Sequence, residues 1–329
     1  MPARLLLSLL LSVLCSLGCD PVSSVPADGS DEQDTPQDLH VDDELAPSAC
    51  SIFPADNPWN TDISAYPVHA RSAEYLDSIG RERSLHPDFG TQWEGAPIGI
   101  PYVVVDGNQT KVAVQFEYED ESDPGPYPIP PNAPIEGVGP SDAGGDRHVL
   151  VLDQENCLLY ELFAAYPQPD GSWEAGSGAI FDLRSNDLRP DHWTSADAAG
   201  LPIFPGLVRY EEVVEQGEIA HALRFTVSRS QRAFIHPATH YASSDTDPSL
   251  PPMGLRLRMK AATDCSWASN EVQVICTALK KYGMFVADNG SNWYISGAPD
   301  PRWDDDALRD LKSFHGDDFE VVESGEARF

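Results

Sequence analysis

The sequence predicts a mainly β fold, an antiparallel β-sandwich of jelly-roll type with a few packed helices. Residues 111–118 and 254–260 alternate apolar and polar side chains with the period of two that is typical of half-buried strands. Proline- and glycine-rich turns separate such runs, and Asp170-Gly171 is a hairpin signal. Helical spacing is confined to three segments. An α+β sheet with helices on one face would give a similar pattern.

The N-terminal segment, residues 1–19, predicts export and lipid anchoring. Arg4 is followed by ten mostly apolar residues, 5–14, which are too few for a permanent membrane helix of about 20 residues. Residues 16–19, Ser-Leu-Gly-Cys, resemble a bacterial lipobox and predict lipidation of Cys19. Serine replaces the usual leucine at position 16, and an ordinary secretory signal is the alternative. The first interpretation places the protein in the bacterial cell envelope, attached to a membrane through lipid only.

Residues 20–49 predict a disordered tether. They contain nine acidic residues, no Lys or Arg, and few large apolar side chains. Such a segment buries too little surface to offset the entropy lost on ordering. Residues 50–329 contain no second segment of this kind and no internal repeat, which predicts a single β-sandwich domain.

The predicted domain is strongly acidic. It carries 44 of the 53 Asp and Glu residues and 20 of the 21 Lys and Arg residues, a formal charge of −24. This charge repels a phosphate backbone, so we expect no nucleic-acid partner. It also disfavours polyanionic substrates, whereas neutral glycans and cationic ligands suffer no such penalty. Simple solubility explains most of the charge equally well.

Four cysteines lie in the predicted domain, an even number for an oxidising compartment. Three pairings are possible. We expect Cys265–Cys276, which closes a short loop, and Cys50–Cys157, which would attach the start of the domain to a central strand. The spacing of the cysteines does not suggest a zinc site.

The remaining elements follow from local patterns. Further strands are expected at residues 100–105, 147–153, 157–164, 179–183, 219–227, 233–236, 284–288 and 293–296. Helices are expected at residues 72–79, 270–282 and 304–314. The second helix has a broad apolar face and ends at Gly283, a natural C-cap. The third has three aspartates in its first turn, where the helix dipole favours negative charge.

Three polar residues share the apolar face of a predicted strand. Glu161, His221 and Asp182 each have apolar neighbours two positions away. A buried carboxylate or imidazole costs several kcal/mol unless it is paired. We therefore expect these residues to line the concave face of the sandwich as acid and base, with a raised carboxyl pKa. The alternative is that they only stabilise the core.

Two loop groups are further candidates. Asp146 and His148 begin a strand after Gly-Gly, a position that suits catalysis. His240 and Tyr241 are candidates for ligand binding, because polysaccharide lyases often use such a pair as base and acid. His236 lies four residues before His240, but the proline after it opposes the helix that a zinc pair would need. We expect no metal site, and the sequence identifies no cofactor.

Four tryptophans lie in polar, turn-like settings: Trp59, Trp193, Trp293 and Trp303. An exposed indole ring stacks on the apolar face of a sugar, and neighbouring Asn and Asp side chains bind hydroxyl groups. We expect Trp59, Trp193 and Trp293 to bind ligand in this way. The alternative is that the tryptophans attach loops to the core.

Common catalytic motifs are absent. The sequence has no Gly-x-Ser-x-Gly elbow, phosphate-binding loop, dinucleotide fingerprint or His-Glu-x-x-His zinc motif. The Glu-x-Asp-x-x-Glu strand of jelly-roll glucanases is also missing. Segments 177–183, 192–203, 205–209 and 282–291 resemble a group of exported bacterial proteins of uncharacterised role, across most of residues 50–322. The resemblance implies an architecture and a compartment but no activity.

These observations predict an exported, lipid-anchored protein that acts on a polysaccharide as a glycoside hydrolase or a lyase. The support is the inward polar residues, the tryptophans in turns and the compartment. The main rival is a non-catalytic surface module that binds glycan or protein. A third hypothesis gives the buried polar residues a purely structural role.

Overall fold

The computed structural model describes residues 50–138 and 145–329, which belong to one compact unit, Ala46–Phe329. The predicted signal, Cys19 and the tether lie outside the described residues. Among the described helices, none has the length and apolar character needed to cross a bilayer. The fold is mainly β, with several sheets and a few helices, as the sequence predicts.

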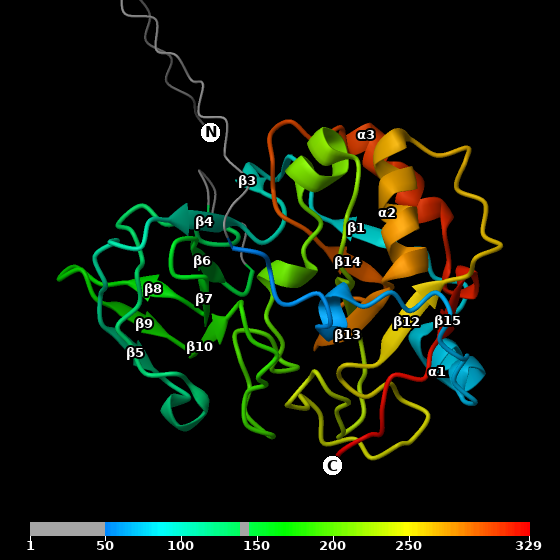
Figure 1. The fold of residues 1–329 in the computed structure, drawn as a ribbon, viewed down its shortest axis with the longest axis horizontal. Coiled ribbons are helices and arrows are strands. Elements are labelled where there is room, and N and C mark those ends of the chain that lie inside the picture. The colour runs from blue at the N-terminus through cyan, green and yellow to red at the C-terminus, as the bar shows by residue number, and fades with distance from the viewer. Residues whose placement is uncertain (1–49, 139–144) are drawn as a thin grey trace, which may run out of the picture. The chain divides into compact units, whose positions relative to one another are not determined.

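The largest sheet has six strands and occupies one side of the domain (Figure 1). In spatial order its strands are β1 (His86–Asp88), β14 (Tyr294–Ser296), β11 (Leu223–Val227), β13 (Met284–Asn289), β12 (Arg256–Met259) and β15 (Phe319–Val321). Helix α2 (Asn270–Lys281) packs against β12, and α1 (Ser72–Ile79) packs against β15. The main hydrophobic core lies between this sheet and the elements that cover it.

The smaller sheets lie together on the other side (Figure 1). A four-stranded sheet has the order β10 (Ser177–Asp182), β7 (Leu158–Phe163), β6 (Val149–Asp153) and β4 (Tyr102–Val105). A three-stranded sheet has the order β5 (Val114–Phe116), β9 (Trp173–Ala175) and β8 (Tyr166–Pro167), and β2 (Gln92–Trp93) pairs with β3 (Ala96–Pro97). A second hydrophobic core, which includes Tyr127 and Tyr160, lies beneath these sheets.

The sheets are mixed, so the predicted antiparallel arrangement holds for some strand pairs and is wrong for others. β11 runs parallel to β13, β1 to β14, β4 to β6 and β5 to β9. Alternation of side chains fixes the face to which a residue points, but it carries no information on the direction of the neighbouring strand. The chain between β11 and β13 contains β12 and α2, which is long enough for a parallel return.

Local signals located most elements correctly. Helices α1 and α2 match their predicted ranges, and the third predicted helix is α3 (Asp305–Leu308) followed by the 3-10 helix Arg309–Ser313. Both predicted disulfides are confirmed, Cys50–Cys157 and Cys265–Cys276. The predicted strand at 233–236 is reduced to isolated bridges of Phe234. Local patterns did not predict β1, β2, β3, β15 or the π-helix Glu211–Gln216, whereas the hairpin signal at Asp170-Gly171 is confirmed by the antiparallel pair β8–β9.

Short 3-10 helices complete the described structure. They comprise Pro58–Asn60, Glu119–Glu121, Phe204–Gly206 and Gly316–Asp318. Phe204–Gly206 ends the segment 192–206, which crosses between the six-stranded and four-stranded sheets. Ala199 N donates to Ala287 O of β13, and Ile203 N donates to Glu161 of β7. This segment therefore joins the two sheets.

Candidate functional site

One face of the six-stranded sheet carries polar side chains on three neighbouring strands. Asp88 of β1 pairs with Ser296 of β14, and Arg224 of β11 donates to Ser296 Oγ at 2.5 Å. Asp88 is exposed, whereas Ser296 and Arg224 are buried. Because paired residues of adjacent strands point to the same face, the three side chains form one polar row.

A second row lies beside the first. His86 pairs with Tyr294, Tyr294 with Thr226, and Thr226 with Asp288. The His86 and Tyr294 rings stack with centroids 4.0 Å apart. All four residues are half-buried. We call the two rows together the polar sheet face.

A β-bulge places Asp288 on this face. Phe225 of β11 pairs with Val286, but the next residue, Thr226, pairs with Asp288, so that Ala287 is the extra residue. A regular register would turn the Asp288 side chain to the opposite, apolar face. The bulge therefore determines which way this carboxyl group points.

A buried ion pair joins the polar sheet face to the loop that carries Asp197. Arg224 Nη2 lies 3.1 Å from Asp197 Oδ1, and both side chains are almost completely buried. Asp197 Oδ2 and Arg224 Nε have no hydrogen-bond partner among the described residues. The N–H of Ala199 donates to Ala287 O at 3.0 Å, which holds the Asp197 loop against the bulge. The pair is therefore fixed in place, and one polar atom of each partner is left without a hydrogen bond among the described residues.

The two carboxyl groups of the polar sheet face differ from ordinary aspartates. Burial, reinforced by the charge of Asp197, raises the pKa of Asp288 to about 7, although Arg224 opposes the change. Solvent reaches Asp88, but the protein around it removes enough water to raise its pKa as well, and Glu136 adds to the effect. At neutral pH, Asp288 is therefore present in both protonated and ionised forms, as acid catalysis requires.

Glu161 lies next to this face but is sealed from solvent. Its side chain is fully buried, and its oxygens accept hydrogen bonds from Ile203 N at 2.9 and 3.0 Å and from Phe204 N at 2.8 Å. Burial raises the pKa of Glu161 to about 7, against the effect of these bonds. Its inward direction matches the prediction, but it has no opening toward a substrate.

His148 is also buried beside the site. Its Nδ1 lies 2.7 Å from Glu136 Oε2, and its Nε2 lies 3.0 Å from Ala196 O. Burial alone would lower the pKa of His148, but the charge and hydrogen bond of Glu136 raise it to about 9. His148 is therefore a charged donor at neutral pH, and its charge acts on Glu161 and Asp288.

The other predicted catalytic residues lie elsewhere. His221 Nε2 is 2.9 Å from Arg209 Nη2 and 3.2 Å from Glu212 Oε2, in a separate buried cluster. Asp182 is exposed and pairs with Arg184 at 3.0 Å, so its predicted inward direction is wrong. Asp182 is the last residue of β10, which is an edge strand of the four-stranded sheet, and the side chain is exposed there. Asp146 is exposed and lies in the loop that precedes β6.

Three of the four tryptophans are not exposed, which corrects that expectation. Trp59 and Trp293 are in the core, and Trp303 is 4 % exposed. The indole N–H of Trp293 donates to Gly80 O at 2.8 Å. Only Trp193 is half-buried, with the Arg189 guanidinium 5.7 Å from its ring centre. The polar neighbours in the sequence correctly indicated loops, but the indole rings of Trp59, Trp293 and Trp303 pack into the core and anchor these loops.

His240 and Tyr241 are half-buried and stack with ring centres 5.6 Å apart. His240 Nδ1 lies 2.8 Å from Ala198 O, the residue after Asp197. The pair is thus attached to the loop that supports the polar sheet face. No group of three or more His, Cys, Asp or Glu residues is placed to hold a metal ion within residues 50–138 and 145–329.

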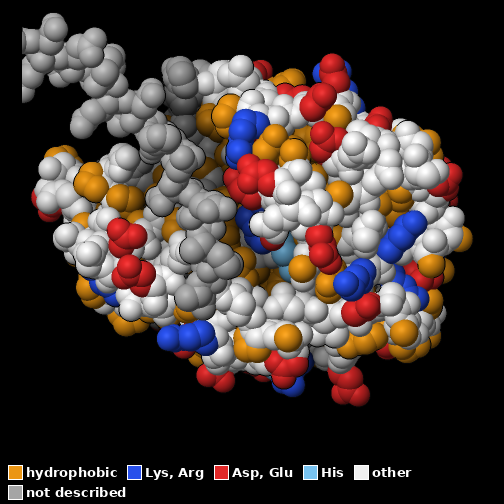
Figure 2. Space-filling model, turned by 45° about the horizontal axis from the view of Figure 1, so that its top comes forward, with side chains coloured by type: hydrophobic (Ala, Val, Ile, Leu, Met, Phe, Trp, Pro, Cys, Tyr) orange, Lys and Arg blue, Asp and Glu red, His pale blue; other side chains and the backbone are white. Residues whose placement is uncertain are grey.

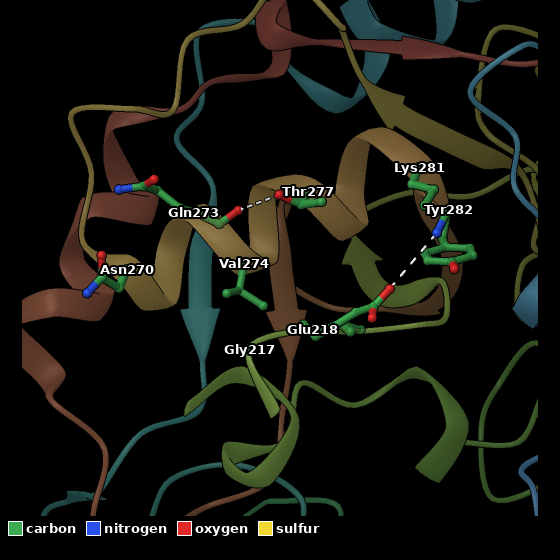
Figure 3. A pocket seen from close by; sticks show the side chains of 9 residues that line it. Gly217, Glu218, Asn270, Gln273, Val274, Thr277, Lys281 and Tyr282 are labelled. Carbon is green, nitrogen blue, oxygen red and sulfur yellow. Dashed lines mark hydrogen bonds and ion pairs between the residues drawn. The ribbon is translucent and has the colours of Figure 1, made fainter. Parts of the chain in front are cut away.

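A small surface cavity of about 430 Å³ lies away from this face (Figure 3). It is lined by α2 and the chain at Gly217–Ile219, and Lys281 lies 4.0 Å from Glu218 at one end. Its other polar side chains are two amides and two hydroxyl groups, those of Asn270, Gln273, Thr277 and Tyr282. The hydrogen bond with Tyr282 raises the pKa of Lys281, so this ammonium group is charged at neutral pH.

Comparison with models of protein families, with curated proteins and with solved structures gives no match. The candidate site therefore rests on geometry alone. Sequence reasoning missed Asp88, Asp197 and Asp288, which are the carboxyl groups of this candidate site and its supporting ion pair. A usable signal was present for one of them, because Asp288 ends an apolar strand just before Asn-Gly, where a chain commonly turns at a sheet edge.

Proposed function

We propose that this protein is an exported, lipid-anchored polysaccharide hydrolase whose catalytic site is the polar sheet face. One observation carries the proposal: two carboxyl groups of raised pKa, Asp88 and Asp288, lie on a solvent-reached sheet face on either side of a buried arginine. The compartment and the anchor rest on the N-terminal sequence.

Asp288 is the proposed general acid. With a pKa of about 7, a large fraction of its carboxyl groups carries a proton at neutral pH and can give it to the glycosidic oxygen. Asp88 is the proposed base that activates water, because burial raises its pKa and so makes its carboxylate a stronger base, although Arg224 opposes the change. The half-buried His86–Tyr294 stack offers an aromatic surface beside them, and burial lowers the pKa of His86 to about 4, which keeps the ring neutral.

The strand order suggests the stereochemical outcome. Asp88 and Asp288 are three strands and one row apart, so strand spacings of about 4.8 Å and a step of about 7 Å along the strand put their Cα atoms roughly 16 Å apart. Retaining glycosidases need carboxyl groups about 5 Å apart, whereas inverting enzymes leave about 6.5–9.5 Å for a water molecule. The separation is too large for a retaining pair, and it reaches the inverting range only if both side chains extend toward each other.

Hydrolysis is favoured over elimination by the state of Arg224. A lyase must neutralise the uronate carboxylate of its substrate, and arginine is well suited to that task. Arg224 is buried and already bonded to Asp197 and Ser296. The acidity of the domain further disfavours a polyuronate.

The test is turnover on a panel of neutral and cationic polysaccharides, measured as new reducing ends. We expect Asp288→Asn to lower the rate by about 10²- to 10⁴-fold without changing the melting temperature by more than a few degrees. Asp182→Asn is the matched control, because Asp182 is exposed and bonded only to the neighbouring Arg184. The parent rate should fall as pH rises above about 7, where Asp288 loses its proton.

Two results would contradict the proposal. Full activity in Asp288→Asn would remove the general acid. Binding of the panel without any turnover by the parent protein would identify a non-catalytic module instead.

A further inference from the structure

A large cleft lies beyond the ends of β1 and β14. It has a volume of about 1110 Å³, and Figure 2, which looks onto the side carrying β3 and the π-helix, shows a hollow near the centre of that side. Its walls are mostly proline, valine and tyrosine, from segments 91–97, 101–104, 134–138, 210–211 and 298–301. The lining is thus more apolar than the polar sheet face.

The edge of β4 forms one wall of this cleft. β4 is the last strand of its sheet and runs parallel to β6, and Tyr102, Val103 and Val104 all line the cleft. Val105 O accepts a bond from Gln154 N of the β6 side. Because successive residues of a strand direct their N–H and C=O groups to opposite sides, Val103 also faces β6, and Tyr102 and Val104 face outward.

This edge lacks the usual protection. Exposed strand edges are commonly blocked by charged side chains, a bulge or a covering element. β4 reads Tyr-Val-Val-Val, and no strand pairs with its outer edge within residues 50–138 and 145–329. Val104 is 45 % exposed, and Val138 across the cleft is 40 % exposed. The edge presents unpaired backbone groups together with apolar surface.

We propose that an extended polypeptide segment of a partner protein binds in this cleft by adding a strand to the outer edge of β4. Backbone hydrogen bonds to Tyr102 and Val104 would provide affinity, and alternate side chains would contact the valines and prolines of the walls. This site is separate from the polar sheet face and does not depend on glycan hydrolysis.

The charge of the cleft identifies the kind of segment. Glu211 and Asp300 line it and share Arg302 with Glu215, at 2.9, 2.6 and 2.7 Å respectively, so three acids surround one base. The segment should therefore be apolar with flanking Lys or Arg. The chain's own residues 20–49, with nine acids and no base, and a second copy of the −24 domain are both disfavoured by repulsion.

The probe is a fluorescent peptide of alternating valine and threonine with two lysines at each end, measured by anisotropy with the full chain. We expect saturable binding that is weakened at least about tenfold by Val104→Pro, which removes an outward N–H without removing a bond to β6. Val104→Thr should bind normally. A peptide N-methylated at alternate residues should not bind, and a glutamate-ended peptide should bind more weakly.

The N-methylated peptide keeps the test decisive if Val104→Pro unfolds. Hydrogen exchange at the Val104 amide should slow when the peptide binds. The proposal is overturned if the parent protein does not bind the peptide, if N-methylation has no effect, or if light scattering shows a dimer that Val104→Pro dissociates.

Discussion

Glu161→Gln should change stability in a way that depends on pH. In the parent protein both carboxyl oxygens accept from Ile203 N, and one also accepts from Phe204 N. Glutamine keeps one acceptor oxygen and directs an NH₂ group at the Ile203 N–H. The lost acceptor should cost about 1–3 kcal/mol in the free energy of unfolding.

Ionisation of Glu161 destabilises the parent protein and so works in the variant's favour. Its pKa rises from 4.5 to about 7 on folding, so the stabilisation by the protonated form is complete below pH 4.5 and is lost as pH rises through 7. The full loss is about 3 kcal/mol, of which roughly 2.5 kcal/mol falls between pH 5 and pH 8. Glutamine does not titrate. The variant should therefore be less stable than the parent at pH 5 and equally stable, or more stable, at pH 8.

Urea unfolding at pH 5, 6, 7 and 8, with both disulfides intact, measures this difference. Other titrating groups contribute to both proteins and cancel in the comparison. Asp182→Asn is the control, and its difference from the parent should stay within about 0.5 kcal/mol because the side chain is exposed. A difference for Glu161→Gln that stays constant, or grows with pH, would refute the assigned burial and protonation of this carboxyl group.

Two further predictions concern the backbone. Gly283→Ala should lower the free energy of unfolding by at least about 2 kcal/mol, because φ is +68° and an added Cβ atom would lie 2.1 Å from Leu257 O. Gly217→Ala should lower it by only about 1 kcal/mol, because φ is +71° but the space around the residue is open. Equal losses of the two variants in thermal melting would contradict this reasoning. Cys157→Ser opens a loop of 107 residues and should lower the free energy of unfolding by about 5 kcal/mol. Cys276→Ser opens a loop of 11 residues and should lower it by only about 3 kcal/mol. If the urea midpoint of Cys276→Ser were the lower of the two, chain entropy would not be the cause.

Signals that are local in sequence predicted local structure well. The apolar face of residues 270–282 and the glycine that follows produced α2 within one residue of its end. Asp304 caps α3 by accepting from two backbone N–H groups, as the acidic first turn indicates. The disulfides were predicted from the even number of cysteines, the short loop between Cys265 and Cys276, and the position of Cys157 in a central strand. Each of these inferences needs only residues that are near in the chain, or few in number.

The candidate site could not be predicted in the same way, because it depends on strand neighbours. His86, Pro87 and Asp88 have no alternating pattern, and β1 exists because it pairs with β14, more than 200 residues later. The apolar neighbours two positions away correctly placed Glu161 among buried side chains, but they gave no information on its access to solvent. The same alternation wrongly predicted an inward direction for Asp182, which is exposed at the end of an edge strand.

The bulge in β13 shows why the site and the fold cannot be separated. One extra residue, Ala287, directs Asp288 toward the polar sheet face instead of the apolar side, where an unpaired carboxylate would cost several kcal/mol. The same residue accepts a hydrogen bond from Ala199, which holds Asp197 where its charge adds to the effect of burial in raising the pKa of Asp288. Direction and protonation of the proposed acid thus have a single structural cause. That cause is a register between β11 and β13, and residues 284–289 alone do not encode it.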